Sequence, residues 1–300
     1  MYGGLGGTLV MDGFYIILVG SLVAVSCALL GCWLILRKMA MVGDAISHAI
    51  LPGIVIAFLA TGTRNTGPML FWACMFGLLS TVLIEWLHQK ARLQTDAAIG
   101  VTFTWLFAIG VILVSVYSSE VDLDQDCVLY GEIAYVPLDL WVTGSGWNLG
   151  PKVAWILGGV LTLVVTFVTL GYKELQLSTF DAEFARFTGM RTQIWHYSLM
   201  SLVSLVTVTA FEAVGAILVV ALLVVPAAVA YLLVNSLRAM LLLAALVGVV
   251  CSVGGYGMAV VTGGSIAGAM ATAAGLLLLL TAVGTVLLRR FVSKADVKMA

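Results

Sequence analysis

The sequence predicts an all-α protein that crosses a membrane many times. Of its 300 residues, 62% are hydrophobic and only 10% are charged, whereas soluble domains average about 25% charged residues. Apolar runs long enough to cross the ~30 Å hydrocarbon core of a bilayer also recur along the chain. The simplest interpretation is one transmembrane domain over residues 1–300.

We count nine of these apolar runs, which form eight membrane spans if one run is re-entrant. They lie near residues 13–36, 45–61, 67–87, 97–117, 152–171, 194–211, 213–234, 239–261 and 266–288. Lys and Arg concentrate in cytoplasmic loops. If the first loop, with Arg37 and Lys38, is cytoplasmic, only Arg64 and Lys152 of the fourteen basic residues lie outside. We therefore expect the N-terminus outside and the C-terminus in the cytoplasm.

The second run carries the most informative motif, GDAISHAILPG at residues 43–53. A helix places Asp44 and His48 on one face, where a carboxylate oxygen and an imidazole nitrogen can approach one divalent ion. An ionisable side chain near the bilayer centre costs roughly 2.5–3.5 kcal/mol and is by default a candidate functional residue. Pro52 has no N–H to bond the carbonyl of His48, so we expect a helix break beside the imidazole.

Three further positions in the later runs need an interpretation. Glu212 is either an acidic cap at the N-terminus of an apolar helix or a second metal contact. Pro226 breaks the hydrogen-bond ladder in the middle of a span, as a hinge or as a tolerated kink. We expect His196 at the membrane interface rather than on a metal, because no carboxylate lies four residues after it.

The outer loop at residues 118–150 is acidic. Its first part contains Glu120, Asp122, Asp124 and Asp126, and Glu132 and Asp139 follow without any Lys or Arg between them. Clustered carboxylates raise the local cation concentration, or they meet basic side chains of a docked partner. The alternative is a solvated loop that happens to be acidic. The apolar centre of the loop predicts a short structured or re-entrant piece.

A cytoplasmic stretch, residues 172–193, predicts a short amphipathic helix at about 178–190. Ser178 or Thr179 can cap its start, three phenylalanines recur at helical spacing, and Gly189 ends it. Such a helix either lies on the bilayer surface or is a knob that a soluble partner grips.

Three motifs together resemble the membrane permease of bacterial ATP-binding-cassette (ABC) importers for manganese, zinc or iron. They are GDAISHAILPG, FDAEFARFTG, and FEAVGAILVVALLVVPAAVAYLL at residues 211–233, and the likeness covers roughly residues 12–292. The resemblance implies a type II ABC importer permease in the bacterial plasma (inner) membrane. It implies that Asp44 and His48 form the metal site. It also implies a coupling helix that seats in an ATPase groove and includes Asp181, Glu183, Ala185 and Gly189.

The same resemblance implies the partners. They are a second permease subunit, identical or paralogous, two cytoplasmic ABC ATPase subunits and an extracytoplasmic metal-binding protein, with membrane lipid around the complex. A two-fold axis brings the same patch of both permeases together, so two Asp and two His can surround one ion and supply four ligands.

Oxygen and imidazole ligands suit manganese, iron and zinc, and the acidic loop and FEAVG sequence resemble the manganese and iron members. We favour manganese as transported cargo and expect no permanently bound cofactor. The chain has no GxxxxGK[ST] phosphate loop, so we expect it not to be an enzyme and ATP to be hydrolysed by a separate subunit. No pattern typical of nucleic-acid binding is present. The alternative is an ion-driven secondary metal transporter, which would favour broken helices in matched halves.

Overall fold

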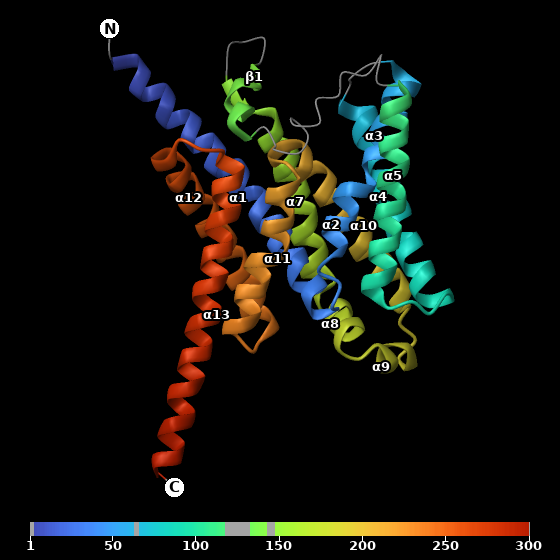
Figure 1. The fold of residues 1–300 in the computed structure, drawn as a ribbon, viewed down its shortest axis with the longest axis vertical. Helices are drawn as coiled ribbons and strands as arrows, with labels where there is room; N and C mark the ends of the chain where they lie inside the picture. The colour runs from blue at the N-terminus through green and yellow to red at the C-terminus, as the bar shows by residue number, and fades with distance from the viewer. Residues whose placement is uncertain (1–2, 63–65, 118–132, 143–147, 300) are drawn as a thin grey trace.

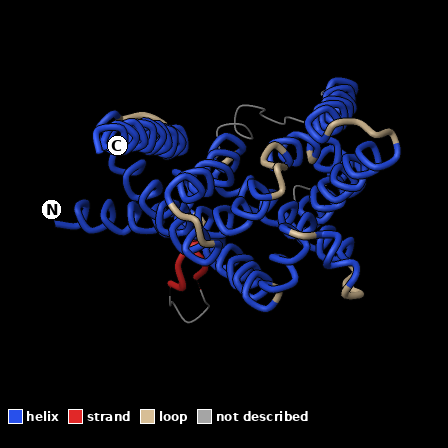
Figure 2. The backbone as a smooth tube through the Cα atoms, turned by 90° about the horizontal axis from the view of Figure 1, so that it is seen from below, coloured by secondary structure: helices blue, strands red, loops and turns tan. Residues whose placement is uncertain are grey.

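The computed structural model describes residues 3–62, 66–117, 133–142 and 148–299, and helices dominate these ranges (Figures 1 and 2). Within them, nine helical segments are long and apolar enough to cross a membrane. This confirms the predicted all-α polytopic class. The number of candidate spans in these ranges is nine, the higher of the two expected numbers. Helices suit this environment because each one satisfies its own backbone hydrogen bonds in lipid.

Along the chain the elements fall into two helical groups, and a short 3-10 helix and two strands are described between them. The first group is α1 (Gly3–Leu36), α2 (Val42–Ala49), α3 (Leu51–Thr61), α4 (Thr66–Lys90) and α5 (Thr95–Tyr117). The region between the groups contains η1 (Ile133–Leu138), β1 (Leu140–Val142) and β2 (Asn148–Pro151). The second group is α7 (Lys152–Leu170), α8 (Tyr172–Phe180), α9 (Ala182–Phe187), α10 (Thr192–Val214), α11 (Ala216–Leu233), α12 (Leu237–Thr262) and α13 (Ile266–Met299).

Helix α1 runs through the middle of the bundle and contacts α7, α10, α11 and α12. Helices α2 to α5 pack against one another on one side, and α13 packs on α11 and α12 on the other (Figure 1). The buried side chains form a continuous apolar core that includes Trp33, Ile46 and Leu223. Helix α10 contacts both α2 and α4, so it joins the two sides.

The described part of the outer loop is structured, as its apolar centre predicts. Ile133 and Val136 of η1 are buried in the core, and η1 contacts α1. Strands β1 and β2 form one antiparallel pair. Asp139 binds Lys152 at 2.8 Å between Oδ1 and Nζ, so this carboxylate already has a basic partner within the chain. The carboxylates at positions 120, 122, 124 and 126 lie outside the described residues.

The break expected at Pro226 does not interrupt the helix. Helix α11 continues from Ala216 to Leu233 with Pro226 inside it. A proline removes one backbone hydrogen bond, and in a membrane bundle neighbouring helices and local adjustments compensate for that loss. Pro226 is therefore tolerated within one span, and the hinge interpretation has no support from a broken helix.

Candidate metal site

The GDAISHAILPG motif folds into two helices that meet at a turn. Helix α2 ends at Ala49, Ile50 forms the turn and α3 begins at Leu51. Pro52 lies in the first turn of α3. Backbone N–H groups in a first turn make no hydrogen bond within the helix, so the missing N–H of proline costs nothing there, and its fixed φ suits the helix start. The expected break is therefore present, and the eight residues of α2 carry Asp44 and His48 within the candidate span Val42–Thr61.

Asp44 and His48 lie side by side on α2. The distance between Asp44 Oδ1 and His48 Nε2 is 3.5 Å. Two ligands bound at typical lengths to one tetrahedral ion lie ~3.4 Å apart. The pair therefore has the spacing that two ligands of a shared ion need. About a third of each side chain is exposed, 37% for Asp44 and 35% for His48, so an ion has access to both.

The surroundings of α2 fix the direction of the imidazole. The His48 ring packs against Phe103 and Phe107 of α5, with ring centroids 5.9 and 5.5 Å away. On the opposite flank, a Cβ on Gly43 would overlap the Leu223 side chain of α11. Any larger residue at this position would force the Leu223 side chain to shift, so Gly43 lets α2 sit close to α11 while α5 holds the ring.

The described residues of one chain supply an incomplete ligand set. Within the described residues, no group of three or more His, Cys, Asp or Glu side chains could hold a metal ion together. Asp44 and His48 supply two donors, whereas protein zinc sites use four ligands and manganese sites use more. Any further donors come from outside these described residues, for instance from water or from another chain.

Glu212 lies elsewhere than predicted. It is exposed in the last turn of α10, because that helix continues to Val214 and ends at Gly215, whose φ is 80°. The interpretation as an N-terminal cap is therefore wrong, since Glu212 is near a helix C-terminus. Its role as a second metal contact stays a prediction.

The predicted cytoplasmic helix begins later than expected. Ser178 and Thr179 lie inside α8, and the separate helix α9 covers Ala182–Phe187. Its cap is Asp181, whose Oδ1 accepts a hydrogen bond of 2.9 Å from the Phe184 N–H. The side-chain cap satisfies one of the free N–H groups at the start of α9. Ser178 and Thr179 cannot cap α9 because they lie inside α8, and Asp181 is the residue directly before α9.

Gly189 ends α9 through a Schellman motif. The Met190 N–H binds the Ala185 carbonyl and the Gly189 N–H binds the Arg186 carbonyl, each at 3.0 Å. Gly189 has a φ of 81°, which costs an L-residue with a side chain about 1–2 kcal/mol. Ala185 is fully buried, so it anchors α9 on the domain and offers no surface to a partner.

Helix α9 lies at the end of the molecule away from β1 (Figure 1), and its exposed side chains include large apolar ones. Phe184 is 54% exposed and Phe187 is 87% exposed, and Phe180 beside them is 60% exposed. Glu183 and Arg186 are exposed on the same short helix. Three adjacent exposed phenylalanines with charges around them are typical of a protein or membrane contact.

A polar network holds α8 in place and was not predicted. Arg37 donates hydrogen bonds to Ser178 and Thr179 at 3.0 and 3.1 Å, and to His196 Nδ1 at 3.1 Å. Because Nδ1 accepts, His196 Nε2 carries the proton and donates to Glu85 at 3.1 Å. The network therefore links the end of α1 to α8, α10 and α4.

Burial lowers the pKa of the Arg37 guanidinium to about 10, and the nearby Glu85 carboxylate opposes this shift. Arg37 is therefore still charged at neutral pH. Its partners lie more than a hundred residues away in the sequence, so the chain shows no local pattern that announces them. The only local signal of this network in the sequence is His196, whose position near a span boundary predicts that it lies at the membrane interface.

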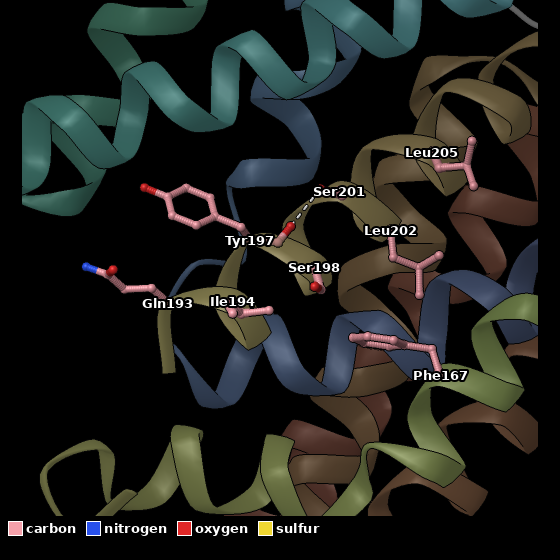
Figure 3. A pocket seen from close by; sticks show the side chains of 8 residues that line it. All are labelled: Phe167, Gln193, Ile194, Tyr197, Ser198, Ser201, Leu202 and Leu205. Atoms are coloured by element: carbon pink, nitrogen blue, oxygen red, sulfur yellow. Dashed lines mark hydrogen bonds between the residues drawn. The ribbon is translucent and has the colours of Figure 1, made fainter. Parts of the chain in front are cut away.

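A groove of about 680 Å³ lies between α7 and α10 (Figure 3). Phe167 and Leu202 line one part of it, and the polar side chains on α10 include Ser198 and Ser201, with Ser201 Oγ bonded to the Tyr197 carbonyl. No carboxylate, imidazole or thiol is among its lining residues. This groove is therefore not a second metal site.

Comparisons with known proteins agree with the motifs. Residues 14–285 match the model of the ABC 3 transport family. The chain is 49% identical to the manganese transport system membrane protein MntD of Bacillus subtilis, over 87% of this chain and 88% of that protein. It is 41% identical to the zinc transport system membrane protein TroD of Treponema pallidum, over 87% of this chain and 71% of that protein. The solved structure of PsaBC from Streptococcus pneumoniae in complex with Fab contains a chain with a similar fold, with a TM-score of 0.72, 32% identity and coverage of 89% of both chains.

Proposed function

The chain belongs to the ABC 3 transport family, and we propose that it imports divalent transition metal ions, with manganese as favoured cargo and iron or zinc as alternatives. It is the permease of a metal ABC importer and a multi-pass bacterial membrane protein. ATP hydrolysis belongs to a separate subunit. The observation that carries the proposed cargo site is the Asp44–His48 pair, held 3.5 Å apart on a broken helix within a candidate span.

Two copies of the pair complete the proposed site. A two-fold axis places identical patches of two permeases face to face, so two carboxylates and two imidazoles surround one ion. The partial exposure of Asp44 and His48 in the single chain leaves their donor atoms accessible for such sharing. The second permease is identical or paralogous. Water fills any remaining coordination positions, which keeps the ion exchangeable during transport.

The donor types support manganese without excluding zinc or iron. A carboxylate oxygen suits manganese, and imidazole suits zinc and iron. The described cysteines at positions 27, 32 and 251 are buried in the core, and no thiol joins Asp44 and His48. Among the relatives, one is named for manganese and another for zinc. The proposed preference for manganese rests on the carboxylate and on the similarity to the manganese protein.

Helix α9 is the proposed contact with the ATPase. Its exposed phenylalanines, with Asp181, Glu183 and Gly189, form the surface that seats in a groove of that subunit, and buried Ala185 fixes the helix on the domain. Arg37 ties the adjacent α8 to α1, α10 and α4. Helices α4 and α10 both contact α2. A displacement of α9 can therefore reach Asp44 and His48 through helices that are packed against one another.

The proposed orientation places α9 in the cytoplasm and the N-terminus outside. Helix α9 and the C-terminus lie at one end of the molecule, and the N-terminus and β1 lie at the other (Figure 1). This arrangement fits the concentration of Lys and Arg in the α9-side loops. The role of the acidic positions 120 to 126 in contact with an extracytoplasmic metal-binding protein stays a prediction, because they lie outside the described residues.

The test is metal uptake by the complete transporter in vesicles. Asp44→Asn and His48→Ala should each lower manganese uptake by about 10–100-fold, the loss typical of a disturbed metal site. Asp96→Asn is a matched control, because Asp96 is an exposed carboxylate in the first turn of α5. Normal uptake by both motif variants would refute the site. Uptake that continues without ATP would instead support the ion-driven carrier.

A further inference from the structure

A groove of about 830 Å³ lies between α7, α8 and α12, on chain segments other than the metal motif. Its apolar part is formed by Val165 and Leu170 of α7 and by Leu241 and Leu242 of α12. Leu170 is 80% exposed and Leu242 is 74% exposed. Both helices are candidate membrane spans, so this wall of the groove faces the hydrocarbon of the bilayer.

Charged side chains lie at one end of the groove only. Lys173 and Glu174 follow the end of the α7 span at Leu170, and Arg238 follows the start of the α12 span at Leu237. The charges therefore lie at the membrane boundary on the α9 side, where phospholipid headgroups are found. Basic side chains at this depth attract lipid phosphate.

The arginine is held in place before any ligand binds. The Arg238 guanidinium carbon lies 5.5 Å from the centroid of the Tyr172 ring, a cation–π contact. Tyr172 in turn packs edge-on against buried Trp33, with ring centroids 6.3 Å apart. A fixed guanidinium loses little freedom when it binds a phosphate.

The groove also contains an unmatched acceptor. Glu174 Oε2 is buried and has no hydrogen-bond partner among the residues that the structure describes. Neither Lys173 nor Arg238 appears in an ion pair within the same residues. Glu174 also lines the groove, so its carboxylate offers a negative charge and a hydrogen-bond acceptor to a ligand with its own N–H donors.

We propose that this groove binds phosphatidylethanolamine from the leaflet on the α9 side. The lipid phosphate binds Lys173 and Arg238, its ammonium group donates hydrogen bonds to Glu174, and its acyl chains lie along the exposed leucines. The headgroup matches both signs of charge. Phosphatidylglycerol lacks the ammonium, and the quaternary ammonium of phosphatidylcholine has no N–H to donate.

The test is lipid retention by the full-length chain, measured by native mass spectrometry after extraction from vesicles of equal parts phosphatidylethanolamine, phosphatidylcholine and phosphatidylglycerol. The unmodified chain should retain phosphatidylethanolamine in excess over the other two lipids. Lys173→Gln with Arg238→Gln should lower that retention by about tenfold. Glu174→Leu should retain phosphatidylethanolamine and phosphatidylcholine equally, because leucine offers no oxygen acceptor to the ammonium N–H groups.

Lys90→Gln is the matched control, since Lys90 is an exposed basic residue at the α9-side end of α4, outside this groove. It should leave retention unchanged. Equal retention of the three lipids by the unmodified chain would overturn the proposal, as would an unchanged preference in the Glu174→Leu variant. Loss of retention in Lys90→Gln as great as in the double variant would also overturn it, because the binding would then be non-specific.

Discussion

Substitutions at Gly189 can distinguish a loss of the proposed ATPase contact from a general loss of protein stability. Its φ is 81°, and a Cβ at this position would meet no atom within 4 Å. An alanine therefore causes backbone strain of about 1–2 kcal/mol and no clash. An arginine adds the same strain and also places a large charged side chain on the surface beside Phe187. Burying that charge without a partner in a packed interface costs several kcal/mol more.

Gly263 is the matched control for this substitution. It follows α12 with a φ of 68° and also has no atom within 4 Å of a Cβ. Because α12 starts on the α9 side and crosses the membrane, Gly263 lies on the opposite side. Gly263→Arg therefore carries the same strain and charge without access to the proposed interface.

The assay is ATP hydrolysis by the partner ATPase, with each permease variant in vesicles and melting temperatures measured in parallel. Gly189→Ala, Gly189→Arg and Gly263→Arg should all lower the melting temperature by a few degrees. Only Gly189→Arg should lower the stimulation of hydrolysis by at least about tenfold. Full stimulation by an inserted Gly189→Arg variant, or an equal loss in Gly263→Arg, would refute the assigned interface.

Two further predictions concern the packing around the site. Gly43→Ala should destabilise the protein by about 1–3 kcal/mol through overpacking against Leu223 and lower metal uptake. The check is a double-mutant cycle measured by thermal unfolding. The variant with both Gly43→Ala and Leu223→Ala should lose less stability than the two single substitutions do in sum, and strictly additive losses of stability would contradict the contact. Arg37→Met should cost about 1.5–3 kcal/mol because it removes hydrogen bonds from a charged group and should weaken ATPase stimulation. Lys38→Met, at an exposed neighbour, should change neither quantity, and equal effects of the two substitutions would count against the network.

The sequence predicts the membrane spans and the metal pair because both depend on short-range patterns. Apolar length alone identifies the nine segments, and the four-residue spacing places Asp44 beside His48 once α2 forms. The break at Ile50 follows from Pro52, since proline has a local effect on helix hydrogen bonding. These features need no knowledge of how the helices pack.

The features that local patterns misplace or leave open depend on the tertiary structure or on competition between neighbouring elements. Pro226 is tolerated inside α11, and Glu212 lies before the end of α10 because Gly215, three residues later, stops that helix. Ser178 and Thr179 are good caps in isolation, but Arg37 binds both of them within α8. Ala185 belongs to the coupling motif by sequence and is buried in the fold. Sequence spacing contains none of these long-range contacts.

The partial exposure of Asp44 and His48 is a stronger argument for a site shared between two chains than the small number of ligands is. Asp44 and His48 lie within a candidate span and expose 37% and 35% of their side chains. Leaving such groups in hydrocarbon costs roughly 2.5–3.5 kcal/mol each, so their exposed faces need water or protein. In the proposed pairing, a two-fold copy supplies both a polar neighbour and further donors. A dispersed single chain should therefore bind manganese far more weakly than the paired permease, and equal affinities measured by titration would contradict a shared site.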